Sequence, residues 1–180
     1  MKKIPFSPPD ITVSEVDLVS GALYSSWITT GPKTKEFERK IAEYCHTDKA
    51  VCLNSATACM ESILRVLGVG PGDEVITSAY TYTATASVTC HVGAKVVMVD
   101  TAPDSFEMDY DKLVEAITPN TKVVIPVDLG GVICDYDRIY ASLESKRHLF
   151  NPANEIQKLF GRVIAVSYTH LRAHETELHL

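Results

Sequence analysis

The sequence contains neither of the glycine-rich loops that most often bind nucleotides. G-x-G-x-x-G and G-x-x-x-x-G-K-[ST] are both absent from its 180 residues, so a dinucleotide-binding fold or a P-loop nucleotidase has no direct support. Basic residues are also few, because 17 lysines and arginines against 23 acidic residues give a net charge of -6. No basic cluster is interleaved with aromatic residues, and we therefore expect no nucleic-acid partner.

Long hydrophobic runs and paired cysteines are missing as well. Lys2 and Lys3 are followed by no apolar segment of signal-peptide length, and no stretch is long enough to span a bilayer. These absences predict a cytoplasmic protein without membrane contact. The five cysteines are odd in number and form no C-x-x-C pair, which disfavours a disulfide framework and a zinc site. We expect reduced and mostly buried cysteines.

Apolar strands and amphipathic helices alternate along the chain. This order predicts an α/β fold, a mostly parallel sheet with helices on both faces, and 46% hydrophobic residues suffice for one core. Strands are predicted at 50–53, 74–78, 95–99, 122–127 and 163–166. Helices are predicted at 14–23, capped by Ser14, and at 33–45, 58–67, 110–117 and 135–148. The stretch 80–89 is rich in small and hydroxylated residues, and the chain is expected to be helical from there up to His91 and Gly93.

The turn Asn54–Thr57 lies between a predicted buried strand and a predicted helix. Its free backbone N–H groups and the positive end of the helix dipole favour an anion, most often a phosphate. The alternative is that Ser55 only caps its helix. Tyr80, Tyr82 and Asp128 also follow predicted strands, and ligands of parallel sheets bind at the carboxyl ends of the strands. One crevice could therefore hold all of these residues.

Five motifs occur in an order that is more specific than any one of them. They are Trp27-Ile-Thr-Thr-Gly-Pro32, Asn54-Ser-Ala-Thr-Ala58, Gly70-Pro-Gly-Asp-Glu-Val-Ile76, Tyr80-Thr-Tyr-Thr-Ala-Thr85 and Ile125-Pro-Val-Asp128. Together they resemble the DegT/DnrJ/EryC1/StrS family of pyridoxal-phosphate-dependent sugar aminotransferases, over about residues 5–166. The resemblance implies an incomplete large domain of an aspartate-aminotransferase-like fold, the type I fold of pyridoxal-phosphate transferases.

The resemblance also implies the roles of individual residues around pyridoxal 5'-phosphate. Ser55, Ala56 and Thr57 would hold the phosphate, with Ala56 where the family commonly has glycine. Tyr82 would stack on the cofactor ring, although core packing is the alternative for it and for Tyr80. Residues implied near the substrate are Trp27, Thr30, Tyr80 and Asp128. A packed loop is the alternative for Trp27 and Thr30, and a turn-forming role is the alternative for Asp128, which stands where many members have histidine.

Two parts of the family's chemistry are not found in this sequence. The pyridine-pairing aspartate is expected in an Asp-Ala-Ala-His motif directly after Val166, and the Schiff-base lysine later still. The chain instead continues from Ser167 to Leu180 in a segment that resembles translated sequencing adapter. His170 and His174 are four residues apart there, but no further ligand completes a metal site, and none is expected. No residue of this chain is therefore assigned a catalytic role.

The resemblance thus implies that the chain is part of an aminotransferase that moves an amino group to a nucleotide-linked keto-sugar, with glutamate as the expected donor. The chain itself is expected to be inactive. Family members are usually homodimers. The predicted segments are an N-terminal arm, helix and active-site loop at 1–32, a partial cofactor-binding large domain at 33–166, and a non-native tail at 167–180. The alternatives are a sugar dehydratase of the same family, a non-enzymatic phosphate-ligand or regulatory module and, least supported, a nicotinamide-dependent enzyme.

Overall fold

A computed structural model describes residues 9–170, and the chain divides into two compact units, Met1–Cys52 and Leu53–Leu180. The boundary between the units falls between Cys52 and Leu53. The predicted segment boundaries after residues 32 and 166 concern function and origin, and they stay predictions. No helix among residues 9–170 is long and apolar enough to cross a bilayer.

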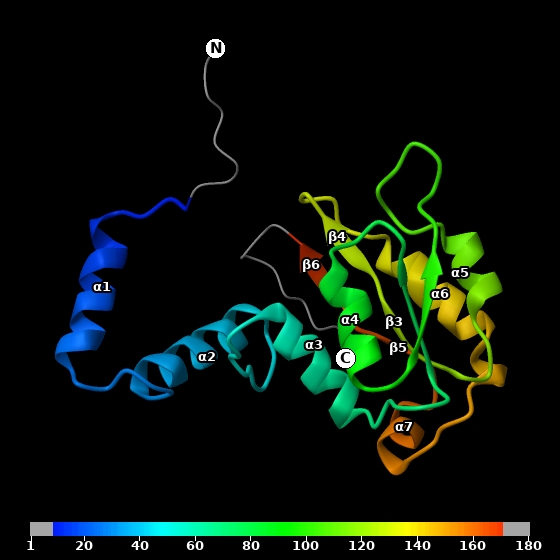
Figure 1. The fold of residues 1–180 in the computed structure, drawn as a ribbon, viewed down its shortest axis with the longest axis horizontal. Coiled ribbons are helices and arrows are strands. Elements are labelled where there is room, and N and C mark those ends of the chain that lie inside the picture. The colour runs from blue at the N-terminus through cyan, green and yellow to red at the C-terminus, as the bar shows by residue number, and fades with distance from the viewer. Residues whose placement is uncertain (1–8, 171–180) are drawn as a thin grey trace. The chain divides into compact units, whose positions relative to one another are not determined.

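The first unit contains two helices, α1 (Val13–Tyr24) and α2 (Pro32–Tyr44) (Figure 1). The cap of α1 is Thr12, two residues before the predicted Ser14. The Thr12 hydroxyl accepts a hydrogen bond from Ser14 N at 3.2 Å, and Glu15 accepts one from Thr12 N at 2.6 Å. The prediction was wrong because both residues are good caps, and only Thr12 has a glutamate three residues later to complete a capping box.

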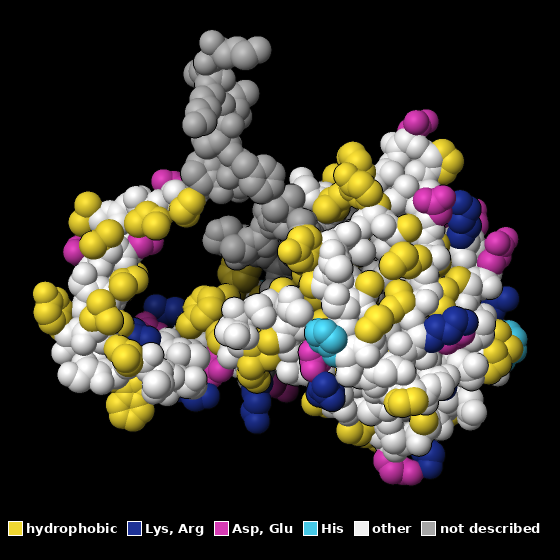
Figure 2. Space-filling view, viewed as in Figure 1, with side chains coloured by type: hydrophobic (Ala, Val, Ile, Leu, Met, Phe, Trp, Pro, Cys, Tyr) yellow, Lys and Arg dark blue, Asp and Glu magenta, His cyan; other side chains and the backbone are white. Residues whose placement is uncertain are grey.

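The surface of α1 is apolar and uncovered within the described chain. The helix has no buried residue, and Figure 2 shows its hydrophobic side chains in yellow at the surface. Exposed apolar patches of this kind are typical of interaction surfaces. The exposed side chains, each 54–74% accessible, are Val13, Val16, Leu18, Val19 and Leu23.

The predicted strand at 50–53 does not form. Val51 is 74% exposed and Leu53 is 46% exposed, and the backbone of Cys52 donates to a side chain, Glu38 Oε1, at 3.1 Å. A strand needs a neighbour that pairs with its N–H and C=O groups. Within residues 9–170 no strand pairs with this segment, so its apolar sequence alone does not produce one.

The second unit contains a parallel sheet, as the sequence predicted, and its strands lie in the order β2-β1-β3-β5. Its strands are β1 (Glu74–Ser78), β2 (Lys95–Val99), β3 (Thr121–Ile125) and β5 (Ile164–Ala165). Its helices are α3 (Ala56–Val66), α4 (Thr83–His91), α5 (Tyr110–Ala116), α6 (Tyr136–Ser145) and α7 (Glu155–Phe160), with a 3-10 turn η1 (Arg147–Leu149) after α6.

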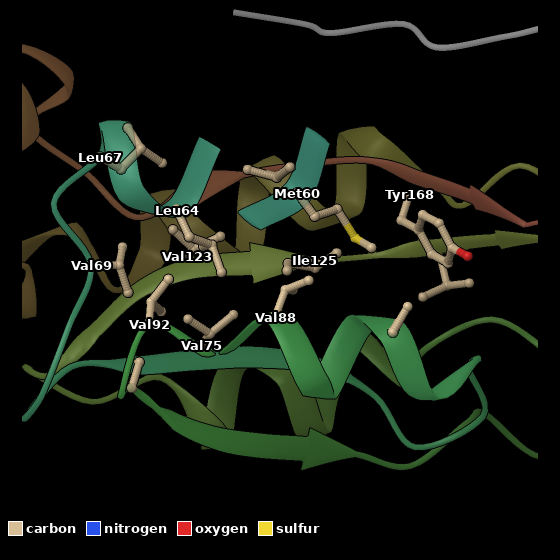
Figure 3. Close-up of a cluster of buried hydrophobic side chains, with 14 residues drawn as sticks. Met60, Leu64, Leu67, Val69, Val75, Val88, Val92, Val123, Ile125 and Tyr168 are labelled. Atoms are coloured by element: carbon tan, nitrogen blue, oxygen red, sulfur yellow. The ribbon is translucent and has the colours of Figure 1, made fainter. Parts of the chain in front are cut away.

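Helices cover both faces of this sheet, and the side chains along each strand point alternately to one face and the other. Val75, Val123 and Ile125 lie in one buried cluster with α3 and α4 (Figure 3), whereas Ile76 and Val124 lie in a second cluster with α5 and α6. Each of these five side chains is fully buried. The prediction of a doubly covered sheet is therefore confirmed, and the helix N-termini of α3 and α4 are placed at one edge of it.

The predicted strand at 122–127 is divided at Pro126. β3 ends at Ile125, and β4 (Val127–Leu129) pairs in parallel with β6 (Tyr168–His170) as a separate two-stranded sheet. Proline has no N–H group to donate to a ladder. The Pro126 carbonyl still accepts a hydrogen bond from Tyr168 N at 3.1 Å, so β4 and β6 extend beyond the carboxyl ends of β3 and β5.

Helix α7 was not predicted, because its main contact is distant in sequence. Its cap Asn154 and the buried Gln157 each donate a side-chain hydrogen bond to the Leu67 carbonyl, at 3.0 and 2.9 Å. These bonds satisfy the end of α3, where Gly68 has a left-handed φ of 66°, as is common for a glycine directly after a helix. A short helix held by such long-range bonds carries little periodic signal.

Candidate functional site

The N-terminus of α3 presents unpaired backbone donors. Ser55 Oγ accepts a hydrogen bond from Ala58 N at 3.1 Å, which confirms that Ser55 caps the helix. The first intrahelical bond is from Cys59 N to Ser55 O, also at 3.1 Å, so the N–H groups of Ala56 and Thr57 have no acceptor inside the helix. Ser55 and Ala56 are exposed and Thr57 is half-buried. This donor set fits an anion such as a phosphate.

Tyr82 lies at the same edge of the sheet as Ser55. It is the N-cap residue of α4, and it makes no side-chain cap bond. Helices α3 and α4 lie on the same face of the sheet, and Figure 3 shows Met60 of α3 and Val88 of α4 in one cluster. α4 connects the parallel strands β1 and β2 and so begins at the carboxyl end of β1. α3 leads into the amino end of β1 and packs against α4, so its N-terminus lies toward the same edge. Tyr82 is 61% exposed.

Tyr168 connects Tyr82 to the second pair of strands. The Tyr168 side chain is buried and lies at one end of the core cluster in Figure 3. Burial raises the pKa of the Tyr168 phenol, and the nearby Tyr82 phenol adds to the rise. Tyr168 belongs to β6, which pairs with β4, the strand that carries Asp128.

Tyr80 faces a different neighbour. Its ring stacks on the ring of Phe106 with centroids 5.4 Å apart and planes 23° apart, and its backbone N–H donates to Ser78 Oγ at 3.2 Å. Tyr80 is 55% exposed. The core-packing alternative considered for Tyr80 and Tyr82 therefore does not describe either ring, while their roles toward a ligand stay predictions.

Asp128 is buried and fully engaged by its own chain. Its Oδ1 accepts from Cys134 N at 2.8 Å, and its Oδ2 accepts from the Tyr136 hydroxyl at 2.9 Å and the Ser167 hydroxyl at 3.0 Å. The hydroxyl oxygens of Tyr136 and Ser167 also lie 2.7 Å from each other. The sequence placed Asp128 just beyond the end of a strand, whereas the structure places it within β4. Its carboxylate organises the turn between β4 and α6, and a direct substrate contact stays a prediction.

The Cys134 thiol shows how strongly the hydrogen-bond network of Asp128 is shielded from water. Burial, and then the adjacent Asp128 carboxylate, raise the pKa of the Cys134 thiol to about 12, and its Sγ donates to the Val127 carbonyl at 3.3 Å. The prediction that the cysteines are mostly buried is wrong, because only Cys134 is buried and Cys90 is exposed.

Cys134 is expected to be the slowest cysteine to react with iodoacetamide at pH 8. With a pKa near 12 in place of the ordinary 9.0, it holds about a thousandfold less thiolate, the reactive form. Mass spectrometry of the alkylated peptides would measure the rates, with the guanidinium-unfolded chain as the control. Equal labelling of Cys134 in the folded and unfolded chains would contradict the buried placement.

Trp27 and Thr30 belong to the first unit, where they make a compact loop. Trp27 Nε1 donates to the Thr30 carbonyl at 3.1 Å. A Cβ atom at Gly31 would lie only 2.1 Å from Trp27 Nε1, so a larger residue there would displace the indole. The indole is nevertheless 58% exposed. This is the packed loop considered as the alternative, and the substrate roles of Trp27 and Thr30 stay predictions.

Sequence reasoning missed Tyr136, Ser167 and Phe106. Ser167 was assigned to the tail segment, yet its hydroxyl is bound to Asp128. Tyr136 begins α6, where it looked like an ordinary helix residue, and only the three-dimensional structure brings its hydroxyl to β4. The aromatic type of Phe106 in an otherwise small and polar loop was the one available signal.

Three lysines of the second unit show how the described residues could or could not reach a carbonyl cofactor. Lys95 and Lys122 begin β2 and β3 and so lie at the opposite, amino ends of the strands. Lys112 lies 3.5 Å from Asp100 and 3.9 Å from Asp109. Residues 9–170 also contain no group of three potential metal ligands, and His174 lies outside the described residues.

A family model for the DegT/DnrJ/EryC1/StrS aminotransferase family matches residues 9–149. The chain belongs to this family. The matched range contains Ser55, Tyr82 and Asp128, so the family resemblance of the ordered motifs is confirmed.

Named relatives agree with this membership. The spore coat polysaccharide biosynthesis protein SpsC of Bacillus subtilis is 42% identical over 77% of this chain and 36% of its own length. The UDP-4-amino-4-deoxy-L-arabinose–oxoglutarate aminotransferase of Shewanella sediminis is 42% identical over 76% of this chain and 35% of its own length. The chain therefore spans about a third of the length of these family members.

Solved structures of the family have the same fold. Spr1654 of Streptococcus pneumoniae, named as a sugar aminotransferase, is 60% identical in its PLP form, with a TM-score of 0.90 over 92% of this chain and 42% of that one. DesV of S. venezuelae, solved with a ketimine intermediate, is 36% identical, with a TM-score of 0.70 over 77% of this chain and 37% of that one. The second unit is accordingly part of the fold of these family members.

Proposed function

We propose that this chain is part of a pyridoxal-phosphate-dependent aminotransferase that acts on a nucleotide-linked keto-sugar. Family membership and the 60% identity to Spr1654 support this proposal. The observation that carries it in the structure is the unpaired N-terminus of α3 beside the exposed Tyr82. A dehydratase is not favoured, because the Shewanella relative and Spr1654 are both named as aminotransferases.

The donor set around Ser55 fits the phosphate of the cofactor. The N–H groups of Ala56 and Thr57 and the hydroxyl of Thr57 can donate to phosphate oxygens, while the dipole of α3 favours their negative charge. Ser55 Oγ already accepts from Ala58 N at 3.1 Å and donates to Asn54 Oδ1 at 3.4 Å, so the backbone N–H groups are the main donors for a phosphate. This chain would thus hold the cofactor by its phosphate.

Tyr82 fits the face of the cofactor ring. A stacked aromatic ring contributes about 1 kcal/mol beyond its buried area and keeps water from that face. When bound, pyridoxal phosphate supplies an electron sink and carries the amino group. Within residues 9–170, position 167, where the family resemblance implies the pyridine-pairing acid, is a serine bound to Asp128. The chain's own share is therefore binding and orientation, and it is expected to be inactive by itself.

The remaining features of the proposed enzyme follow from its relatives. The name of the Shewanella protein contains a UDP-linked amino sugar and oxoglutarate, and we propose a nucleotide-sugar substrate with glutamate as the amino donor for the protein to which this chain belongs. A cytoplasmic homodimer is part of the same proposal. The uncovered apolar side chains of α1 support an assembly in which that helix is buried.

Pyridoxamine phosphate is expected to bind the purified chain at least tenfold more tightly than pyridoxamine does. The phosphate contributes charge-assisted hydrogen bonds, each of about 1.5–3 kcal/mol, that pyridoxamine cannot make. Isothermal titration calorimetry would measure both affinities, and the amine form avoids unspecific imine formation with surface lysines. Tyr82→Ala should weaken binding about fivefold, whereas Tyr24→Ala, at a 90% exposed tyrosine of α1, should not. Equal binding of the two amines would contradict the proposal.

A further inference from the structure

The loop between β2 and α5 encloses an open depression at the carboxyl end of β2. Its volume is about 600 Å³, within the range of about 300–1,000 Å³ that is usual for small-molecule sites. In Figure 1 this green loop projects beyond the sheet on its way into α5. The depression is lined by residues 100–106 and by Lys112.

The loop is held in place by its base. Thr101 forms a bridge with Met108, and Ala102 N donates to the Glu107 carbonyl at 3.0 Å. Met108 is only 1% exposed and anchors the returning strand of the loop in the core below α5. The depression is therefore supported by buried contacts.

Phe106 joins this depression to the candidate cofactor site. Its ring lines the depression and also stacks on Tyr80, which follows β1. Phe106 is 57% exposed and Tyr80 is 55% exposed, so the two nearly parallel rings still present apolar area to a ligand. A third planar ring can extend such a stack, and stacking of a nucleobase on an aromatic side chain contributes about 1–3 kcal/mol.

The charges of the depression favour a neutral ligand that carries donors. The Lys112 ammonium is shared between Asp100 at 3.5 Å and Asp109 at 3.9 Å, and Asp104 adds another carboxylate to the lining. These acids repel phosphate groups. The Asp100 side chain is 71% exposed, and a carboxylate accepts hydrogen bonds from hydroxyl groups.

We propose that this depression binds the nucleoside end of the substrate, with the base stacked on Phe106 and Tyr80 and the ribose hydroxyls donating to Asp100. This inference rests on the proposed function, since it assigns one end of the nucleotide-linked sugar. Phe106 is then a residue that determines specificity, and the phosphates of the substrate lie outside the acidic lining.

Uridine is the probe for this site. We expect Phe106→Ala to weaken uridine binding to the 180-residue chain about tenfold, measured by calorimetry, because a stacking face is lost. Phe106→Tyr should restore the affinity. Phe37→Ala is the matched control, because Phe37 is 56% exposed and lies on α2. Inorganic phosphate should not compete with uridine. Circular dichroism would show that each variant remains folded.

The inference is overturned if uridine does not bind at about 10 mM, the weak end of measurable affinity, or if Phe106→Ala and Phe37→Ala bind it equally. Its failure is distinguishable from failure of the proposed function. Binding of pyridoxamine phosphate without binding of uridine would remove the nucleoside site alone. Uridine binding that depends on Phe106, without pyridoxamine phosphate binding, would support the nucleoside site and remove the cofactor assignment.

Discussion

Leu64→Ala is expected to lower the free energy of unfolding by about 3–4 kcal/mol, the usual cost of removing a fully buried leucine side chain. Leu64 is 0% exposed and lies in the cluster between α3, α4 and the sheet (Figure 3). The loss combines transfer of the side chain from the core with the cavity left behind. Because domains are stable by only about 5–15 kcal/mol, the variant is expected to unfold at a much lower urea concentration.

Urea unfolding followed by circular dichroism measures this change. Val66→Ala is the matched control on the same helix, because Val66 is 65% exposed, and surface substitutions usually change stability by less than about 0.5 kcal/mol. An equal shift of the midpoint in both variants would show that α3 does not pack on the sheet through Leu64. Such a result would also remove the support that places Ser55 at the carboxyl edge.

The second unit could be predicted because its strands and helices carry their own local signals. β1 and β2 occur at the predicted residues 74–78 and 95–99, where short apolar runs are followed by helical periodicity. The alternation of Val75 and Ile76 between two clusters follows from the period of a strand, so covered faces were predictable as well.

The errors arise where a distant residue decides the outcome. The apolar run at 50–53 has the composition of a strand, but no described strand pairs with it. Helix α7 depends on bonds to the Leu67 carbonyl. Pro126 was read as part of one strand, although its missing N–H ends the ladder of β3. Local propensity is outweighed by tertiary context in each of these segments.

The candidate site was predictable in position more than in detail. Residues at the ends of predicted strands were expected to meet, and α3 and α4, whose N-cap residues are Ser55 and Tyr82, pack in one cluster on the same face of the sheet. The hydrogen bonds of Asp128 could not be foreseen, because Tyr136 and Ser167 are 8 and 39 residues away in sequence. A carboxylate that accepts from three groups is expected to be structural first, and the sequence alone offers no means of counting those groups.

Ser55→Asp is expected to weaken binding of pyridoxamine phosphate at least tenfold while leaving the fold intact. Aspartate is as good an N-cap as serine, so its carboxylate can accept the hydrogen bond that Ser55 Oγ accepts from Ala58 N. The same carboxylate adds a negative charge beside the N–H groups of Ala56 and Thr57. Two anions about 4 Å apart repel by about 4 kcal/mol near a protein surface. A tenfold loss of affinity corresponds to about 1.4 kcal/mol, so the expected loss is large enough for the calorimetric titration to detect.

Thr12→Asp provides the control for this charge change, because Thr12 caps α1 in the first unit. It introduces the same charge at a helix cap and should leave the affinity for pyridoxamine phosphate unchanged. The contrast separates the two interpretations of the α3 turn. If Ser55 serves only as a cap, both variants bind like the wild-type chain. If the turn also holds the phosphate, only Ser55→Asp loses affinity, and its urea midpoint stays where it was.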